Sequence, residues 1–456
     1  MAPLDYIHAR KSWNSERRSE DSKRPDEFHC VMVDDRPYLP FLNVQVGSIE
    51  AREESCRRAV LAIFGWNDEF EDGHRNVLLH VRPVSGGNTN VLLCVSNLSQ
   101  IRRPTTTGRT RTRTTRSPTS NTNTTVPDKV LVRIFGAHGL IDRDAETSTY
   151  AALAQQGLAL PYYGRFGNGR IEGWSEWKCL AEEEVGNYAI PIARAMATLH
   201  ETAQLPPAPA LTPDEATPTM WMQLQDWIGT AVTAKFPIAQ DMERAAALNI
   251  PQWQDELTFS KTKVIPNDAS VGFCHNDVLA ANILCNDDGN NDNNNDNNNN
   301  NPASMTTKQV QLIDFEYGGF NYWSYDIANH FNEYAGGTNE PSATPNYDLF
   351  PSPQLQRAFV QEYLTTRRRL HPTGNGSTVP LTDSSTTVED TEVEALLTEI
   401  SAFVLANHLV WASWAVNQAS AEGCTEFDYL QYAKCRIERY YEDRARWLEK
   451  HQPPGS

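Results

Sequence analysis

The chain has few cysteines and no paired cysteine motif. Its eight cysteines are scattered over 456 residues, and none stands in a Cys-x-x-Cys pair. A disulfide-rich secreted domain has a much higher cysteine density, and a zinc site needs a recognisable ligand spacing, which the Cys274-His275 pair and the nearby Cys285 do not provide. We therefore expect reduced thiols in a cytoplasmic protein without a zinc site.

The sequence also lacks a long apolar run and an excess of positive charge. No stretch of 18 apolar residues occurs, so we expect no membrane-spanning helix and no integral membrane association. Residues 1–24 are polar and charged and lack the apolar core of a secretory signal. The formal net charge of −18 argues against a nucleic-acid-binding protein. An apolar fraction of 39% in a chain of this length is typical of a soluble enzyme with two or three lobes.

Several segments are too polar to contribute to a core. Residues 1–27 are predicted to be a disordered leader. Residues 101–126 are rich in Arg, Thr, Ser and Asn, residues 286–301 form an Asn/Asp tract, and residues 372–391 are rich in Gly, Ser and Thr. We predict that these three inserts are disordered surface loops. The entropy of closing a loop grows slowly with its length, so a fold tolerates such insertions.

Between these segments, the pattern of apolar residues predicts strands first and helices later. Residues 77–84 and 91–95 are expected to form a hairpin, residues 130–135 a third strand, and residues 162–174 two short strands around Asn168-Gly169. The apolar spacing predicts the main helices at residues 146–157, 188–199, 221–232, 354–367, 393–418 and 429–450.

Two short segments carry the strongest functional signal. Residues 272–284 read Gly-Phe-Cys-His-Asn-Asp-Val-Leu-Ala-Ala-Asn-Ile-Leu, and they place Asp277 and Asn282 five residues apart. Residues 311–318 read Gln-Leu-Ile-Asp-Phe-Glu-Tyr-Gly, in which an apolar approach ends at Asp314. Phosphoryl transfer from ATP needs a carboxylate that accepts the proton of the attacking hydroxyl, together with an amide and a second carboxylate that hold magnesium against the phosphates.

The spacing of these residues is that of a kinase catalytic loop. Asn276 stands where protein kinases usually have Arg, and Glu316 stands where they have the Gly of Asp-Phe-Gly. We predict that Asp277 is the catalytic base, which orients the acceptor hydroxyl. Asn282 and Asp314 are the predicted magnesium ligands, because Mg²⁺ prefers hard oxygen donors and keeps several waters. Capping of a turn by Asp277 is the structural alternative.

With these segments in order, the chain resembles the choline/ethanolamine kinase family over about residues 38–450, outside the three inserts. The catalytic-loop motif alone would also fit aminoglycoside, fructosamine or homoserine kinases. The segments Asp314-Phe-Glu-Tyr317 and Asp326-Ile-Ala-Asn-His-Phe331 favour the choline/ethanolamine group. Within that group, residues 131–136, 141–144 and 166–172 look more like ethanolamine kinases.

The resemblance implies a bilobal, protein-kinase-like α+β fold. A small N-terminal lobe with an antiparallel sheet would bind the nucleotide over residues 28–172. A larger, mostly helical lobe over residues 173–456 would carry catalysis and acceptor binding. Members of the family are often dimers, so a homodimer is possible.

Nucleotide-binding residues are predicted in the first lobe. Arg133, at the end of the third strand, is expected to contact the ATP phosphates, with Glu146 as its ion-pair partner; a surface Arg at a strand end is the alternative. Two glycines allow backbone N–H groups to approach an anion closely, so a Gly-rich turn is expected to cover the phosphates. The resemblance also places Glu172 and Trp174 at the hinge that would read adenine. The residues of the turn are Ser85, Gly86, Gly87, Asn88, Thr89 and Asn90.

A cationic acceptor needs aromatic faces and negative charge. Trp411 and Trp414 share one face of a predicted helix, and Phe427 and Tyr432 follow in the next segment. Such a cluster binds ammonium by cation–π attraction, although an aromatic core between helices is the alternative interpretation. The resemblance assigns these positions to the acceptor pocket and places Glu333 near it.

The predicted reaction is Mg²⁺- and ATP-dependent phosphorylation of ethanolamine to phosphoethanolamine, the first step of the CDP-ethanolamine route to phosphatidylethanolamine. A choline kinase, or a dual choline/ethanolamine kinase making phosphocholine, is the nearest alternative. A catalytically weak ATP- or amine-binding regulatory module would require loss of Asp277, Asn282 or Asp314, and all three are present. An antibiotic or sugar kinase of the same wider fold is the remaining possibility.

Overall fold

The computed structural model divides into two compact units, which meet in the chain between Glu176 and Trp177. The predicted leader, the insert 101–126 and Ser85 to Thr89 of the Gly-rich turn lie outside the described residues. The structure describes residues 30–33, 35–64, 79–84, 90–98, 127–136, 142–205, 217–286, 308–338, 342–370 and 388–451.

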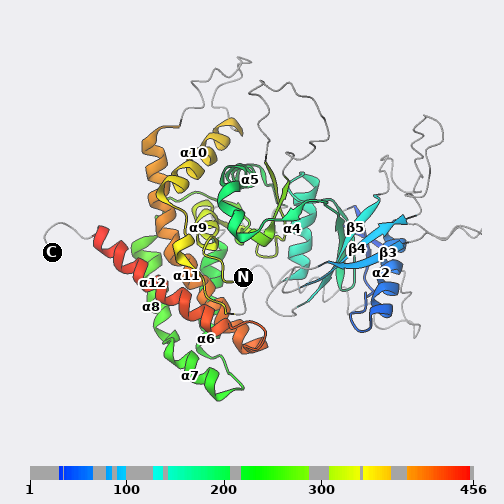
Figure 1. The fold of residues 1–456 in the computed structure, drawn as a ribbon, viewed down its shortest axis with the longest axis horizontal. Coiled ribbons are helices and arrows are strands. Elements are labelled where there is room, and N and C mark those ends of the chain that lie inside the picture. Colours follow the sequence, from blue (N-terminus) through cyan, green and yellow to red (C-terminus); the bar gives the residue numbers. More distant parts are fainter. Residues whose placement is uncertain are drawn as a thin grey trace, which may run out of the picture. The chain divides into compact units, whose positions relative to one another are not determined.

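A seven-stranded sheet forms the centre of the first unit (Figure 1). The strand order is β1-β2-β6-β7-β5-β4-β3, and all neighbours are antiparallel except β2 and β6. The strands are β1 (Val31–Val33), β2 (Arg36–Leu39), β3 (Leu79–Val84), β4 (Asn90–Asn97), β5 (Lys129–Phe135), β6 (Tyr162–Phe166) and β7 (Gly169–Gly173). The predicted hairpin is confirmed as β3–β4, whereas the pattern missed β1 and most of β2, which are short.

Among the described residues of this unit, helices α2 (Ile49–Phe64) and α4 (Arg143–Gln155) accompany the sheet. Helix α2 buries Cys56, Ala59 and Val60 in the same core as Val132 of β5. Helix α4 begins three residues before the predicted start because the Asp142 carboxylate accepts hydrogen bonds from two backbone N–H groups of the first turn.

The second unit is mostly helical (Figure 1). Helix α11, which is largely buried, packs against α12, α9, α6 and α10. The helices are α5 (Ala189–Thr202), α6 (Thr219–Val232), α7 (Ala239–Ala247), α8 (Trp253–Phe259), α9 (Trp323–Glu333), α10 (Pro353–Leu370), α11 (Asp390–Glu422) and α12 (Tyr429–His451). Short helical turns lie at η2 (Glu182–Tyr188), η3 (Ile250–Gln252), η4 (Ser260–Val264), η5 (Ala280–Asn282) and η6 (Tyr347–Leu349).

In the described part of the second unit, two small sheets carry the predicted catalytic segments. One has the order β11-β10-β8, and the other pairs β12 with β9. Their strands are β8 (Lys178–Cys179), β9 (Val271–Cys274), β10 (Ile283–Asn286), β11 (Gln309–Leu312) and β12 (Gly319–Tyr322). The predicted return to a strand after Asn282 and the predicted strand before Asp314 are therefore both confirmed.

The structure corrects two predicted loop boundaries. The insert 372–391 was predicted to be disordered to its end, but Val388 is buried and α11 begins at Asp390. A capping box between Glu389 and Glu392 starts this helix, so local hydrogen bonds override the polar composition. Likewise Asn286, the first residue of the Asn/Asp tract, is the last residue of β10.

Among the described residues, one helix is long and apolar enough to cross a membrane. It is α11, and 67% of its most apolar window is buried inside the protein. This burial is typical of a core helix in a folded domain.

Candidate active site

The β10–β11 pair brings Asn282 and Asp314 to the same end of a sheet. Ile283 of β10 lies opposite Leu312 of β11. Beyond this pair, the Ile313 N–H donates a hydrogen bond to the Asn282 carbonyl at 2.9 Å. Asp314 follows with a φ of 64°, a left-handed conformation that costs a non-glycine residue about 1 kcal/mol. The two predicted magnesium ligands are thus neighbours in space.

Asp277 and Asn282 are joined by hydrogen bonds across the catalytic loop. The Asn282 side-chain nitrogen donates to the Asp277 carboxylate at 3.0 Å and to the Asp277 carbonyl at 2.9 Å. This arrangement leaves the amide oxygen of Asn282 available as a hard oxygen ligand for a metal ion. The amide therefore links the predicted base to the predicted metal site.

Several carboxylates surround Asp277. Burial raises the pKa of Asp277 well above its usual range, and the negative charges of Glu333, Glu316 and Asp314 raise it further. Asp277 itself is only 7% exposed. Such a concentration of negative charge at low exposure is favourable only beside cations. A magnesium ion and a cationic acceptor would supply them.

The backbone of the catalytic loop is anchored on Asp326 of α9. One carboxylate oxygen accepts from the Asn276 N–H at 2.7 Å, and the other accepts from the His275 N–H at 2.9 Å. Asp326 is fully buried. Burial alone would raise the pKa of Asp326, but hydrogen bonding and charge from His200 and His275 keep it below its usual value.

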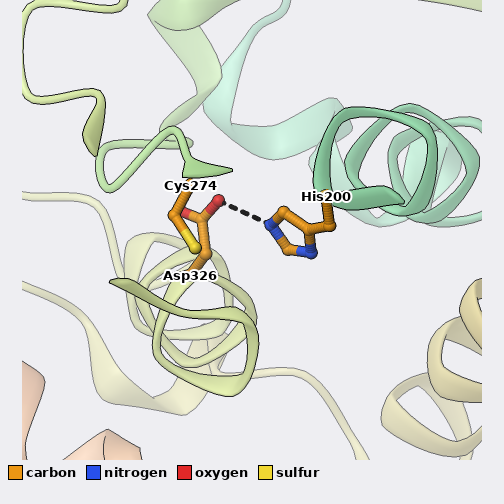
Figure 2. A group of neighbouring side chains, drawn as sticks. All are labelled: His200, Cys274 and Asp326. Atoms are coloured by element: carbon orange, nitrogen blue, oxygen red, sulfur yellow. Dashed lines mark hydrogen bonds and ion pairs between the residues drawn. The ribbon is translucent and has the colours of Figure 1, made fainter. Parts of the chain in front are cut away.

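His200, Cys274 and Asp326 form a buried group that includes this anchor, as Figure 2 shows. The His200 Nε2 atom lies 3.0 Å from Asp326, and its Nδ1 atom lies 2.7 Å from the Tyr363 hydroxyl. The group has ligand types that suit a metal. However, both ring nitrogens are engaged, and burial raises the pKa of the Cys274 thiol well above its usual value, which disfavours the thiolate that a metal needs. The group therefore serves to hold the loop.

Asn276, which stands where protein kinases usually have Arg, has both backbone and side-chain roles in the loop. Its φ is 67°, a left-handed conformation that Asn tolerates better than most residues. The side-chain nitrogen donates to the Tyr317 carbonyl at 2.8 Å, and the side-chain oxygen accepts from Asn321 at 2.8 Å. Asn276 thus ties the catalytic loop to the segment that carries Asp314.

The four aromatic residues predicted for the acceptor pocket form one cluster. The Trp411 and Trp414 rings are 5.5 Å apart, the Trp414 and Tyr432 rings 6.5 Å, and the Phe427 and Tyr432 rings 5.9 Å. Sequence reasoning missed Tyr317, whose hydroxyl accepts a hydrogen bond from the Trp414 indole at 3.1 Å. Its place two residues after the aromatic Phe315, in the Asp314 segment, was the available signal.

The charge of the catalytic loop reaches this cluster. The pKa of Tyr317 is raised well above its usual value by burial first and then by the negative charges of Glu316 and Asp277. The pKa of Tyr432 is also raised, chiefly by burial, although the positive charge of Arg436 opposes the shift. Glu333 and Asp277 add to the increase for Tyr432. The aromatic cluster therefore lies within electrostatic reach of these carboxylates.

Glu333 has a buried partner that sequence reasoning missed. One of its oxygens lies 3.3 Å from the Arg436 guanidinium, and both residues are almost completely buried. Burial raises the pKa of Glu333 even though Arg436 acts in the opposite direction. Arg436 lies four positions after Tyr432 on α12, and this helical spacing was the available sequence signal.

In the first unit, Arg133 belongs to a buried ion-pair network. Its guanidinium lies 2.8 Å from Glu172, which also pairs with Arg170 at 2.6 Å. Burial is the largest effect on the pKa of Glu172 and raises it. The positive charges and hydrogen bonds of Arg133 and Arg170 together outweigh burial and lower this pKa to about 2. The β5–β7 register places Arg133 opposite Arg170, so the shared Glu172 offsets their repulsion.

This network revises the predicted partner of Arg133. Among the described residues, Arg133 forms an ion pair with Glu172, whereas Glu146 pairs with Arg170 at 2.7 Å and with Arg143 at 2.8 Å. Register explains the difference, because Glu172 projects from the neighbouring strand. The Glu172 side chain is therefore engaged in this network, which the hinge prediction did not anticipate.

Two other predicted nucleotide contacts lie within the described residues. Trp174 follows β7, and the Arg82 guanidinium lies over its ring at 4.9 Å. Asn90 begins β4 and is buried, with its side-chain oxygen 3.4 Å from the Gly136 nitrogen. Both residues belong to the same unit as Arg133.

The family model described as choline/ethanolamine kinase matches residues 81–441. The probable ethanolamine kinase A of Dictyostelium discoideum is 29% identical over 323 residues, covering 70% of this chain and 78% of that protein. Ethanolamine kinase 1 of Mus musculus is 30% identical over 326 residues, covering 70% and 77%. The probable choline kinase 1 of Arabidopsis thaliana is 29% identical over 392 residues, covering 84% and 90%.

Solved structures with the same fold include kinases of both kinds. The structure of an ethanolamine kinase from Plasmodium vivax aligns with a TM-score of 0.62 and 19% identity, covering 86% of this chain and 89% of that one. A choline kinase from Cryptosporidium parvum aligns with a TM-score of 0.56 and 19% identity, covering 86% and 97%. The predicted protein-kinase-like α+β fold is confirmed.

Proposed function

This chain belongs to the choline/ethanolamine kinase family, and we propose that it transfers the γ-phosphoryl group of ATP to the hydroxyl of ethanolamine. Membership of the family implies a phosphotransferase that uses ATP and an amino alcohol. Choline is the alternative acceptor, because relatives named for each substrate match at similar identity.

Asp277 is the proposed base. It would accept the proton of the acceptor hydroxyl and hold that oxygen in line with the phosphoryl group. Burial and neighbouring carboxylates raise the pKa of Asp277. A nearby cation would lower that pKa again and so favour the ionised form that a base needs. The hydrogen bond from Asn282 fixes the direction of its carboxylate.

The side chains of Asn282 and Asp314 fit a magnesium ion. An amide oxygen and a carboxylate lie at adjacent strand ends, and the surrounding carboxylates favour a divalent cation. Bound there, Mg²⁺ would neutralise negative charge on the phosphates of ATP. Arg133, held by Glu172, is the proposed contact for those phosphates in the first unit.

The observation that carries the choice of acceptor is the joining of aromatic faces and carboxylates in one site. Trp411, Trp414 and Tyr432 supply aromatic rings for an ammonium group, and Asp277 and Glu333 supply carboxylates close enough to raise the pKa of Tyr432. A neutral polyol would gain little from this arrangement. An amino alcohol has both the charge and the hydroxyl that the site requires.

The test is a competition assay with Mg-ATP that compares kcat/KM for ethanolamine and choline on the same protein. We expect a clear preference for ethanolamine. A preference for choline would replace the proposed substrate with the alternative, and phosphorylation of neither amine would end the proposal. The variant Asp277→Asn, checked for wild-type Tm, should lose turnover while keeping ATP binding.

A further inference from the structure

Arg436 lies at the centre of the residues proposed for acceptor binding. It projects from α12 and is 1% exposed. Its Nη1 atom lies 3.3 Å from a Glu333 oxygen and 3.2 Å from the Tyr432 hydroxyl. Its Nη2 atom donates to the Asn407 side-chain oxygen at 2.5 Å. A guanidinium is a planar fork, so these contacts fix the direction of each partner.

The same guanidinium is connected to Trp411 of the cluster through two amides. The Asn407 nitrogen donates to the Asn329 oxygen at 2.7 Å. That oxygen also accepts from the Trp411 indole nitrogen at 2.7 Å. One buried cation therefore aligns the Glu333 carboxylate of α9, the Tyr432 phenol of α12 and, through the amides, the Trp411 indole of α11.

The contact with Arg436 leaves one oxygen of Glu333 available. Arg436 engages the Oε1 atom, and the Oε2 atom has no hydrogen-bond partner among the residues that the structure describes. Because Oε1 is held, the direction of Oε2 is held too. At the same time, the positive charge of Arg436 offsets much of the negative charge of Glu333. What Glu333 offers to a ligand is therefore a directed hydrogen-bond acceptor more than a net charge.

This distinction separates amines by their number of N–H groups. A primary ammonium has three N–H donors, whereas a trimethylammonium has none. A directed carboxylate oxygen favours binding of the primary ammonium, because a charge-assisted hydrogen bond depends on geometry. Attraction to aromatic faces serves both, because it depends only on charge and proximity.

We propose that Arg436 is a positioning residue that orients Glu333 toward the N–H groups of the acceptor and thereby sets the preference for primary over quaternary amines. This inference rests on the proposed function, since it concerns the same site. It adds a residue and a physical basis for selectivity that the aromatic cluster alone does not provide.

The experiment uses four acceptors, ethanolamine, N-methylethanolamine, N,N-dimethylethanolamine and choline, with the full chain and Mg-ATP. The variant Arg436→Lys keeps the positive charge but replaces the two Nη atoms that reach Glu333, Tyr432 and Asn407 by a single ammonium nitrogen on a flexible stem. We expect kcat/KM for ethanolamine to fall about tenfold, the two intermediate amines to fall by graded amounts, and choline to change less than about twofold. The KM for ATP should stay the same.

Arg439→Lys is the matched control. Arg439 lies one turn along α12, is more exposed, and pairs with Asp443. This substitution should leave the ratio of kcat/KM for ethanolamine and choline unchanged. Arg436→Lys is expected to lower Tm, so Glu333→Gln provides a second variant that keeps the arginine. This variant should also reduce the ratio of kcat/KM for ethanolamine to that for choline.

The outcomes separate the two proposals. If the wild-type protein phosphorylates neither ethanolamine nor choline, the proposed function fails. If it is active but Arg436→Lys lowers kcat/KM equally for all four amines, Arg436 only stabilises the fold and the inference is wrong. A wild-type protein that prefers choline would also overturn the inference, while leaving the kinase assignment intact.

Discussion

Replacing Asp326 by Asn tests whether α9 holds the catalytic loop. The substitution hardly changes the volume of the side chain, so no cavity complicates the result. One carboxylate oxygen accepts from Asn276, and the other accepts from both His275 and His200. We expect the new amide nitrogen to replace the oxygen that accepts from Asn276, because only one hydrogen bond is lost at that oxygen and two would be lost at the other.

The magnitude follows from these contacts. The Asn276 N–H would face another donor, and losing a hydrogen bond to a charged acceptor costs about 2 kcal/mol. The two remaining bonds would be made to a neutral oxygen and weaken by about 0.5 kcal/mol each. We therefore expect Asp326→Asn to lower the free energy of unfolding by about 3 kcal/mol. The left-handed conformation of Asn276 would then relax, and Asp277 would move with it.

Urea denaturation and steady-state kinetics measure these two effects. A displacement of Asp277 by about 1 Å should lower kcat about 100-fold at saturating substrates. The exposed Asp348→Asn variant is the control and should match the wild type in both assays. If Asp326→Asn unfolds at lower urea but keeps the wild-type kcat at conditions where it is folded, Asp326 stabilises the unit without positioning Asp277. No change in either quantity would refute the anchoring role altogether.

Three further predictions concern single residues of the second unit. Asn276→Ala should be about 1 kcal/mol less stable than Asn276→Gly by urea denaturation, because only Gly adopts a φ of 67° without cost. Burial lowers the pKa of His330 from 6.5 to about 4, so protonation of His330 favours the unfolded chain. The free energy of unfolding should be at its full value above about pH 6.5 and should fall by about 1.4 kcal/mol per pH unit toward pH 4. In denaturation measured as a function of pH, His330→Gln should reduce this loss. Trp414→Leu should lower kcat/KM for the amine about tenfold and leave the KM for ATP unchanged, as expected for a lost cation–π contact. The control Trp447→Leu should leave kcat/KM for the amine unchanged.

Each of these predictions has a distinct contrary result. Equal stability of the Ala and Gly variants would mean that the backbone of Asn276 relaxes without cost. A pH dependence that persists in His330→Gln would assign the acid sensitivity to other groups. If Trp414→Leu changes only Tm, the aromatic cluster is core packing and not an amine site.

The sequence by itself determined the features that depend on short spacing. Asp277 and Asn282 are close enough in the chain for the loop between them to close with local hydrogen bonds. The apolar approach to Asp314 predicted its strand, and apolar periodicity predicted the main helices. These patterns are local, so the sequence carries them directly.

Only the tertiary structure decided the partners of the buried charges. Glu333 and Arg436 are 103 positions apart, and a buried arginine looks in sequence like a surface one. The pairing of Arg133 with Glu172 depends on the register of β5 against β7. Such choices are made by packing between distant elements, where the cost of burying an unpaired charge selects the arrangement. The local spacing of residues in the sequence does not reveal this cost. The proposed selectivity of the acceptor site depends on the buried pairing that the cost selects.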